Sequence, residues 1–331
     1  MRRLQLGMTA LALSLMGLFL LKFVDREGKP VTVRLASQPA APRVSPAEAG
    51  IEPAALDAAA EFAGRHGTRA LVVGRNGHIV FEKYWGDTNF DTSVETGFDP
   101  VLAALVVGTT FEDRLMHSLD EPLANYVTDL GAPQKSYNLR ELLAGDHADV
   151  TVAEATDLLA LALERVTKQP WQSIVAQRLW APLGGGDLVF HQGESKLRPA
   201  GVSSGCCLRA RIGDWMRLGE LLLNGGIYEG NELMPPRYAG LIVAPTHKDS
   251  PRGFFTRLDG NFADRVVWLD GSDRQRLWIV PALRLTVLRI GGEPSSGWDE
   301  AMIPDSIIRG TSGWHPPIPG QDVDPGKFAP H

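Results

Sequence analysis

Short apolar segments with strand character lie near both ends of the chain, and a long helical stretch separates them. Near the start, residues 69–85 (RALVVGRNGHIVFEKYW) form two apolar runs around Asn76 and Gly77, a pair typical of a tight hairpin turn. Near the end, residues 265–292 contain three short runs rich in valine, isoleucine and tryptophan, which predict an antiparallel meander. Any sheet must therefore combine distant parts of the chain, which indicates an α+β fold.

The stretch between these strands predicts helices, because apolar residues recur there at helical spacing. In residues 152–169, apolar side chains fall at 155, 158, 159, 162 and 166, on one face of a helix. Similar patterns predict helices over 53–67, 100–113, 170–184, 211–226 and 298–310. The expected architecture is an antiparallel sheet flanked by helices, with a helical subdomain.

The composition excludes several classes of function. The chain has 331 residues, is 44% hydrophobic and 22% charged, and carries a net charge of -6, with lysines and arginines scattered along it. This balance argues against nucleic-acid binding. His147 and His247 stand in polar loop sequence, without an HExxH motif, paired histidines at helical spacing or CxxC. We therefore expect no nucleic-acid partner, no metal and no cofactor.

The first residues predict a membrane anchor. Residues 4–21 carry no charge, and 18 helical residues span about 27 Å, enough to cross a bilayer. Arg2 and Arg3 precede this run, which favours a cytoplasmic N-terminus and a body on the periplasmic side of the inner membrane. A cleaved signal peptide and a buried soluble helix are the alternatives. Because no small-residue cleavage site follows the apolar run directly, we interpret residues 1–24 as an uncleaved single-pass anchor.

The remaining chain divides by composition. Residues 25–50 are rich in proline, alanine and serine and predict an extended linker. The folded domain is expected over 51–310. Residues 311–331 form a proline-rich tail that is expected to be extended, and its PPIP sequence would suit the groove of a partner protein.

The only two cysteines are adjacent, at Cys206 and Cys207. A disulfide between neighbouring residues is strained and rare. We therefore interpret both cysteines as small buried apolar side chains.

Residues 201–205, GVSSG, fit the Gly-x-Ser-x-Gly pattern that places a nucleophilic serine on a sharp turn in many hydrolases. Such a turn needs a buried strand before it and a helix directly after it. Here the preceding residues 191–200 are polar, and CCLRAR, which follows, is no helix start. We interpret the segment as a glycine-rich turn and keep Ser203 as the less favoured nucleophile.

Several segments resemble the serine β-lactamase and penicillin-binding-protein-like family, in particular its class C and family VIII esterase branch. The resemblance rests on framework sequences spread over residues 70–310, such as ALVVGRNGHIVFEKYWG, LVVGTTFEDRLMHSLDEPLANYV, LLALALERVTKQPWQSIVAQRLWAPLG and RQRLWIVPALRLTVLRIGG. It implies a β-lactamase/transpeptidase-like fold. It also implies a catalytic serine with a lysine three residues later, at the start of a helix, where the lysine removes the serine proton.

The chain departs from this family at the nucleophile. Counting back from residues 105–108, the serine position falls on Gly97 and the lysine position on Pro100. No serine in the chain is followed by a lysine three residues later. The local sequence instead suits a helix start, with Asp99 as the expected N-cap and Pro100 in the first turn.

Two further family elements do not stand at the positions where the resemblance would place them. The catalytic tyrosine position falls near Thr151, and its polar companion near Ala153. The Lys/His-x-Gly element falls on Ser272, Asp273 and Arg274, which places an arginine where a glycine would admit substrate. The bulk of Arg274 is expected to fill the pocket. Asp273, Arg274 and Arg276 would form a charged strand edge or, less favourably, bind a charged ligand.

These observations favour a membrane-anchored pseudoenzyme that acts as a binding, scaffold or accessory subunit with another membrane or periplasmic protein. The alternative is an active serine hydrolase of the esterase, β-lactamase or peptidoglycan peptidase type, using Ser203 or another unrecognised nucleophile. A stable subunit of a membrane complex is a third possibility. The sequence does not identify the partner or any small-molecule ligand.

Overall fold

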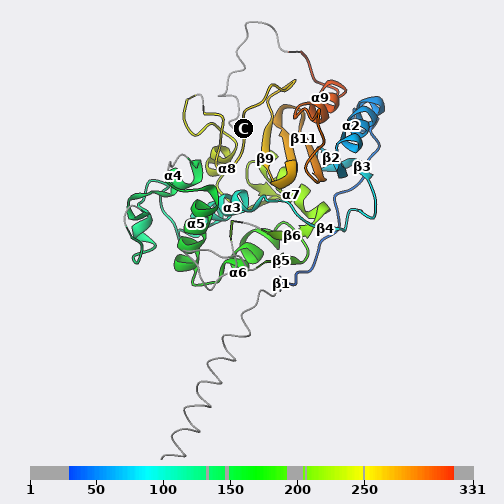
Figure 1. Ribbon diagram of the computed structural model, residues 1–331. Helices are drawn as coiled ribbons and strands as arrows, with labels where there is room; N and C mark the ends of the chain where they lie inside the picture. Colours follow the sequence, from blue (N-terminus) through cyan, green and yellow to red (C-terminus); the bar gives the residue numbers. More distant parts are fainter. Residues whose placement is uncertain are drawn as a thin grey trace, which may run out of the picture.

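A five-stranded antiparallel sheet forms the centre of the molecule (Figure 1). The computed structural model describes residues 30–131, 134–145, 149–191, 204–205, 207–248 and 250–316. The strand order is β3-β2-β11-β10-β9. The strands are β2 (Thr68–Arg75), β3 (His78–Tyr84), β9 (Val267–Asp270), β10 (Arg276–Val280) and β11 (Leu285–Gly291).

The predicted hairpin and meander are confirmed. Asn76 and Gly77 join β2 to β3 with φ angles of 52° and 75°, the left-handed backbone that a two-residue hairpin turn requires. Strands β9, β10 and β11 follow one another as an antiparallel meander. Pairing between β2 and β11 then joins the two ends of the body, so the sheet combines distant segments as the sequence predicts.

Both faces of this sheet are buried. In β2, Leu71 and Val73 pack with helices α2 (Pro53–Arg65) and α9 (Met302–Arg309), whereas Ala70 and Val72 face the larger core on the other side. Helix α7 (Ile212–Leu223) covers that second face. The strand period of two therefore sends alternate side chains into two separate cores.

A helical block adjoins the sheet (Figure 1). Helix α3 (Asp99–Glu112) is buried along almost its entire length and packs against α5 and α6. The block also contains α4 (Leu139–Ala144), α5 (Val152–Thr167), α6 (Trp171–Val175) with the π-helical turn Ala176–Trp180, and α8 (Pro236–Ile242). Short 3₁₀ turns lie at Leu123–Asn125, Gln134–Ser136, Ser272–Arg274 and Pro281–Leu283. The six helices expected from spacing are all present; α4 and α8 are too short for spacing to reveal them.

A second sheet was not predicted. Its order is β1-β5-β6-β4, built from β1 (Val31–Val33), β4 (Ser93–Glu95), β5 (Leu188–Phe190) and β6 (Leu208–Arg211). A two-stranded hairpin joins β7 (Ile227–Tyr228) to β8 (Asn231–Glu232). These strands have two to four residues, which is too few for an alternating pattern to stand out.

Strand β1 lies within residues 25–50, so the prediction that this whole segment is an extended linker is wrong. Val31–Val33 pairs with β5, and Arg43 forms a bridge to Ile79. Residues 31–50 therefore belong to the folded body, which begins before the boundary expected near Ile51. Val31, Val33 and Leu35 also pack against the main core, but the prolines and small residues around them hide this short strand in the sequence.

The described residues near the C-terminus pack on the folded body and do not form part of an extended tail. Thr311 pairs with Ile51, and the Trp314 indole donates to the carbonyl of Ala263 at 3.1 Å, so the first residues of the expected tail also pack on the body. Residues 317–331 and the predicted anchor, 1–24, lie outside the described residues. Within the described ranges, no helix combines the length and apolar character needed to span a membrane.

Candidate functional site

A pocket of about 140 Å³ lies where helix α3 begins. Its walls come from the first turn of α3, the end of α4, the first residue of α5, the loop 252–257 and the end of β9 at Asp270. Gly97 and Pro100 both line it. The structure thus places the two residues that the resemblance aligned with the nucleophile and its base in one pocket.

Gly97 has neither a functional group nor room for one. Its φ of 75° lies in the left-handed region, which side chains other than glycine rarely adopt. A Cβ added there would lie 2.7 Å from the backbone nitrogen of Ser272. That nitrogen donates to the carbonyl oxygen of Thr96 at 3.1 Å. The loop before α3 and the loop after β9 therefore close against each other at the nucleophile position.

The start of α3 differs from the expected helix cap. Phe98 occupies the N-cap position and makes no side-chain cap, and Asp99 is the first helical residue. Asp99 is buried, and its Oδ1 accepts a hydrogen bond from the backbone nitrogen of Leu208 at 3.1 Å. The described residues offer its Oδ2 no hydrogen-bond partner. Burial raises the pKa of Asp99 to about 7. Asp99 thus connects α3 to strand β6, which sequence spacing does not reveal.

Thr151, which the resemblance aligned with the catalytic tyrosine, serves as a helix cap. Thr151 precedes α5, and its Oγ1 accepts a hydrogen bond from the backbone nitrogen of Glu154 at 3.2 Å. The Glu154 carboxylate accepts from the backbone nitrogen of Thr151 at 2.9 Å, which completes a capping box. Ala153 packs against Gly205, where an added Cβ would lie 3.1 Å from the Cα of Ala153. Both positions therefore have structural contacts.

Ser203 lies outside the described residues, so its proposed role stays a prediction. Its neighbour Ser204 is buried and bonded to Asp157 of α5, because both its hydroxyl and its backbone nitrogen donate to Asp157 Oδ1. The second serine of GVSSG is therefore held against α5. Cys207 is disulfide-bonded, and Cys206 is the only other cysteine in the chain. For Cys207, the interpretation as a small buried apolar side chain is therefore wrong, whereas Cys206 lies outside the described residues.

Arg274 does not fill the pocket as expected. Its side chain is about half exposed and pairs with Glu300 at 3.4 Å and Glu293 at 3.9 Å. Arg276, placed by sequence on a charged edge, is 2% exposed and lies on β10, an inner strand, where it pairs with Glu300 and Asp270 at 2.7 Å. Residues 274 and 276 thus connect β10 to the segment before α9.

The cationic side chains of the pocket come instead from the loop 252–257, which no sequence motif indicated. Arg257 is already paired, because its guanidinium donates to the carboxylate of Asp259 and stacks on Trp268 at 5.2 Å. This pairing lowers the pKa of Asp259. Arg252 is different: within the described residues, its guanidinium has no hydrogen bond or ion pair. The sequence does not show that Arg252 reaches this pocket, because the fold alone brings the loop 252–257 beside the start of α3.

The pocket can bind more readily than it can cleave. Its described walls contain no serine, cysteine, lysine or tyrosine. The one hydroxyl there, on Thr256, is buried and donates to the carbonyl of Ile242. No cluster of metal-ligating side chains occurs among the described residues, and His247 is exposed, while His147 lies outside them. Among the described residues, what remains is a small cavity in which the guanidinium of Arg252 makes no hydrogen bond or ion pair.

No protein-family model and no curated protein sequence matches this chain. Solved structures do. A "putative 6-aminohexanoate-dimer hydrolase" from Bacillus anthracis superposes with a TM-score of 0.67 at 16% identity, over 81% of this chain and 87% of that one. A "putative beta-lactamase" from Bacteroides dorei gives 0.61 at 16% identity, over 75% and 94%. A family VIII carboxylesterase gives 0.58 at 14% identity, over 78% and 98%.

These similarities agree with the resemblance that the framework segments carry. At such low identity, they speak for the fold and not for the activity. The chain has the α+β fold of the serine β-lactamases, penicillin-binding-protein homologues and family VIII esterases.

Proposed function

We propose that this protein is a non-hydrolytic member of the β-lactamase-like fold, held at the inner membrane with its domain on the periplasmic side, where it binds rather than cleaves. The observation that carries the proposal is the start of α3. Gly97 has a left-handed backbone pressed against Ser272, and Pro100 stands where a lysine would act as base. An acyl-transfer site needs a nucleophile and its base in contact, and neither group is present there.

The remaining pocket supports a binding role. Arg252 offers a guanidinium that the described residues leave unpartnered, and a guanidinium recognises carboxylate or phosphate groups in a forked, two-bond geometry. A small anionic ligand, or an acidic side chain of a partner protein, would fit this chemistry. Together with the anchor predicted for residues 1–24, this favours an accessory subunit that works beside another membrane or periplasmic protein.

A fluorophosphonate probe tests the absence of hydrolysis directly, because it labels activated serine nucleophiles. We expect the purified protein to remain unlabelled, and to turn over nitrocefin and short p-nitrophenyl esters no faster than a Gly97→Trp control. Clear turnover above that control would overturn the proposal.

The alternative, an active serine hydrolase, has one supporting observation: proteins of similar fold include an esterase and hydrolases. Ser203→Ala decides between the two functions. Labelling of the native protein that this substitution abolishes would establish Ser203 as a nucleophile. Labelling that survives it would point to another residue.

The accessory role has a test of its own. Extraction of the native protein in mild detergent, followed by identification of co-purifying chains, should recover a membrane or periplasmic partner. Arg252→Ala should weaken that recovery if the pocket takes part. Recovery only as a lone monomer counts against the accessory role.

A further inference from the structure

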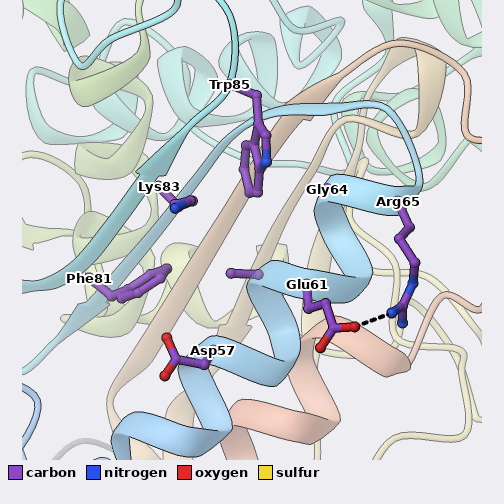
Figure 2. Close-up of a pocket in the computed structure, with 8 residues that line it drawn as sticks. Asp57, Glu61, Gly64, Arg65, Phe81, Lys83 and Trp85 are labelled. Atoms are coloured by element: carbon purple, nitrogen blue, oxygen red, sulfur yellow. Dashed lines mark hydrogen bonds and ion pairs between the residues drawn. The ribbon is translucent and has the colours of Figure 1, made fainter.

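A second and larger hollow lies at the opposite edge of the five-stranded sheet. It has a volume of about 500 Å³ and runs between α2 and the edge strand β3 (Figure 2). The helix contributes residues spaced three or four apart, from Asp57 to Arg65, and the strand contributes alternate residues, from Phe81 to Trp85. One helix face and one strand face thus form two walls, which we call the α2–β3 groove.

The depth of this groove depends on small residues in α2. Ala60 is 8% exposed and forms part of the lining. Gly64 lies against the indole of Trp85, since an added Cβ would come within 2.9 Å of the indole nitrogen. The rings of Trp85 and Phe81 are half-buried. The groove therefore has an apolar interior with two aromatic surfaces.

The rim carries opposite charges that are not used within the protein. Lys83 and Asp57 are exposed, and neither side chain forms an ion pair or a hydrogen bond with any of the described residues. Figure 2 shows Lys83 projecting from β3, Trp85 from the residue directly after it and Asp57 from α2 around one opening. Glu61 and Arg65 also line the groove, but they differ from Asp57 and Lys83 because they pair with each other.

An ammonium on one wall, a carboxylate on the other and aromatic rings between them complement a zwitterion with an apolar middle. The volume lies within the range of small-ligand sites, about 300 to 1,000 Å³. An edge strand also offers main-chain groups to an extended peptide, except at Ile79, where those of β3 already bond to Pro42 and Val44. We propose that the α2–β3 groove binds a short zwitterionic peptide. Its carboxylate lies against Lys83, its ammonium against Asp57, and an apolar side chain against Trp85.

This proposal is independent of the cleft, and a ligand-observed NMR titration of the full-length protein in detergent tests it. The probe is the tripeptide Ala-Phe-Ala, with empty micelles as the blank and the N-acetylated, C-amidated form as the matched ligand. Exposed ion pairs are weak, so we expect dissociation constants in the millimolar range. Lys83→Met and Asp57→Asn should each weaken binding about threefold and the double variant about tenfold, and capping the peptide should weaken it similarly.

Controls separate this site from the cleft. Glu52→Gln removes an exposed acidic charge just before α2 and outside the groove lining, so it should leave binding unchanged. Equal binding of the capped peptide, or full binding by the double variant, would overturn the proposal. So would loss of binding on Arg252→Ala, which would place the peptide in the cleft, or no binding above the micelle blank. Because all four substituted side chains lie at exposed or half-buried sites, a thermal melt of each variant confirms that it is folded.

Discussion

The two edges of the five-stranded sheet treat their polar groups in opposite ways. At the β9 edge, the loop around Gly97 closes on Ser272, Asp99 is buried against Leu208, and Arg257 is paired with Asp259. At the β3 edge, Glu82 pairs with Arg43 and Glu61 pairs with Arg65, but within the described residues Lys83 and Asp57 stand exposed and unpaired. Around Gly97, most polar groups of the described residues are buried or paired within the protein. Among the described residues of the two pockets, the charges without a partner are those of Lys83 and Asp57 at the β3 edge and of Arg252 at the start of α3.

The largest test of this contrast is Asp99→Asn, measured against pH. Between pH 4 and 7, a carboxyl whose pKa is raised to about 7 keeps its proton in the folded protein, whereas the unfolded chain has lost it. The folded state then binds more protons, so its stability falls as the pH rises through this window. Below pH 4, the group contributes no such change.

Asparagine does not titrate, so the difference in unfolding free energy between native protein and variant isolates this effect. At about 1.4 kcal/mol per pKa unit, the native protein should lose up to about 4 kcal/mol relative to Asp99→Asn between pH 4 and 7. Urea denaturation at a series of pH values measures it. If the unfolding free energies of the two proteins changed with pH in parallel, the site of Asp99 would not disfavour its charged form.

The second test is Gly97→Ser, which restores the hydroxyl that the family would place there. We expect a loss of about 2 to 4 kcal/mol in unfolding free energy, from left-handed backbone strain and from overlap with Ser272. Gly86→Ser is the matched control. Gly86 also has a positive φ, 65°, but an added Cβ there meets nothing within 4 Å.

The control should lose only the backbone part, about 1 to 2 kcal/mol. Equal losses at both glycines would mean that the loop against Ser272 can open, and the contrast between the two edges would weaken. The double variant Gly97→Ser, Pro100→Lys, if folded, should still not hydrolyse nitrocefin, since the closed loop leaves no space for substrate at that serine.

A smaller effect is expected at Thr151, which the resemblance aligned with the catalytic tyrosine. Thr151→Ala removes one half of the capping box of α5 and should cost about 1 kcal/mol of unfolding free energy. Asn138→Ala provides the reference, because Asn138 caps α4 in the same way with Glu141. If Thr151→Ala costs nothing while Asn138→Ala does, Thr151 has been kept for something other than capping.

The smallest effect is expected at the β3 edge. Lys83→Met and Asp57→Asn should each change the unfolding free energy by less than about 0.5 kcal/mol, because neither side chain has a partner to lose. The same variants are predicted above to weaken peptide binding. A stability loss of 1 kcal/mol or more would show that these charges support the fold, which would remove the contrast between the two edges.

Local patterns were sufficient to predict much of this structure. The Asn76–Gly77 turn, the three-strand meander and the helices over 152–169 and 211–226 follow from residue spacing and turn chemistry. Framework segments were also sufficient to indicate the fold. The second sheet was missed because its strands have four residues or fewer and pair segments that lie far apart, such as 31–33 with 188–190.

The candidate site was predicted only in part. Gly97 and Pro100, which the resemblance aligned with the nucleophile and its base, line one pocket, but Arg274, which was expected to fill that pocket, does not line it. A side chain's direction depends on the backbone that holds it, and the positive φ angles at Asp273 and Arg274 accompany a turn that leaves Arg274 beside Glu300. Arg252 and Arg257 lie about 150 residues after Gly97, so no local pattern connects them to the start of α3.

By itself, the sequence determined that the serine, lysine and tyrosine motifs of the resembled family are missing, since this depends on residue identity alone. It also determined the hairpin, the meander and the main helices, since these depend on neighbours along the chain. Tertiary structure decided the rest: that Gly97 is closed against Ser272, that Asp99 is buried, that Arg252 reaches the cleft, and that α2 and β3 leave a charged groove. Burial, pKa and pairing depend on groups brought together from distant positions, and only the folded chain specifies which groups those are.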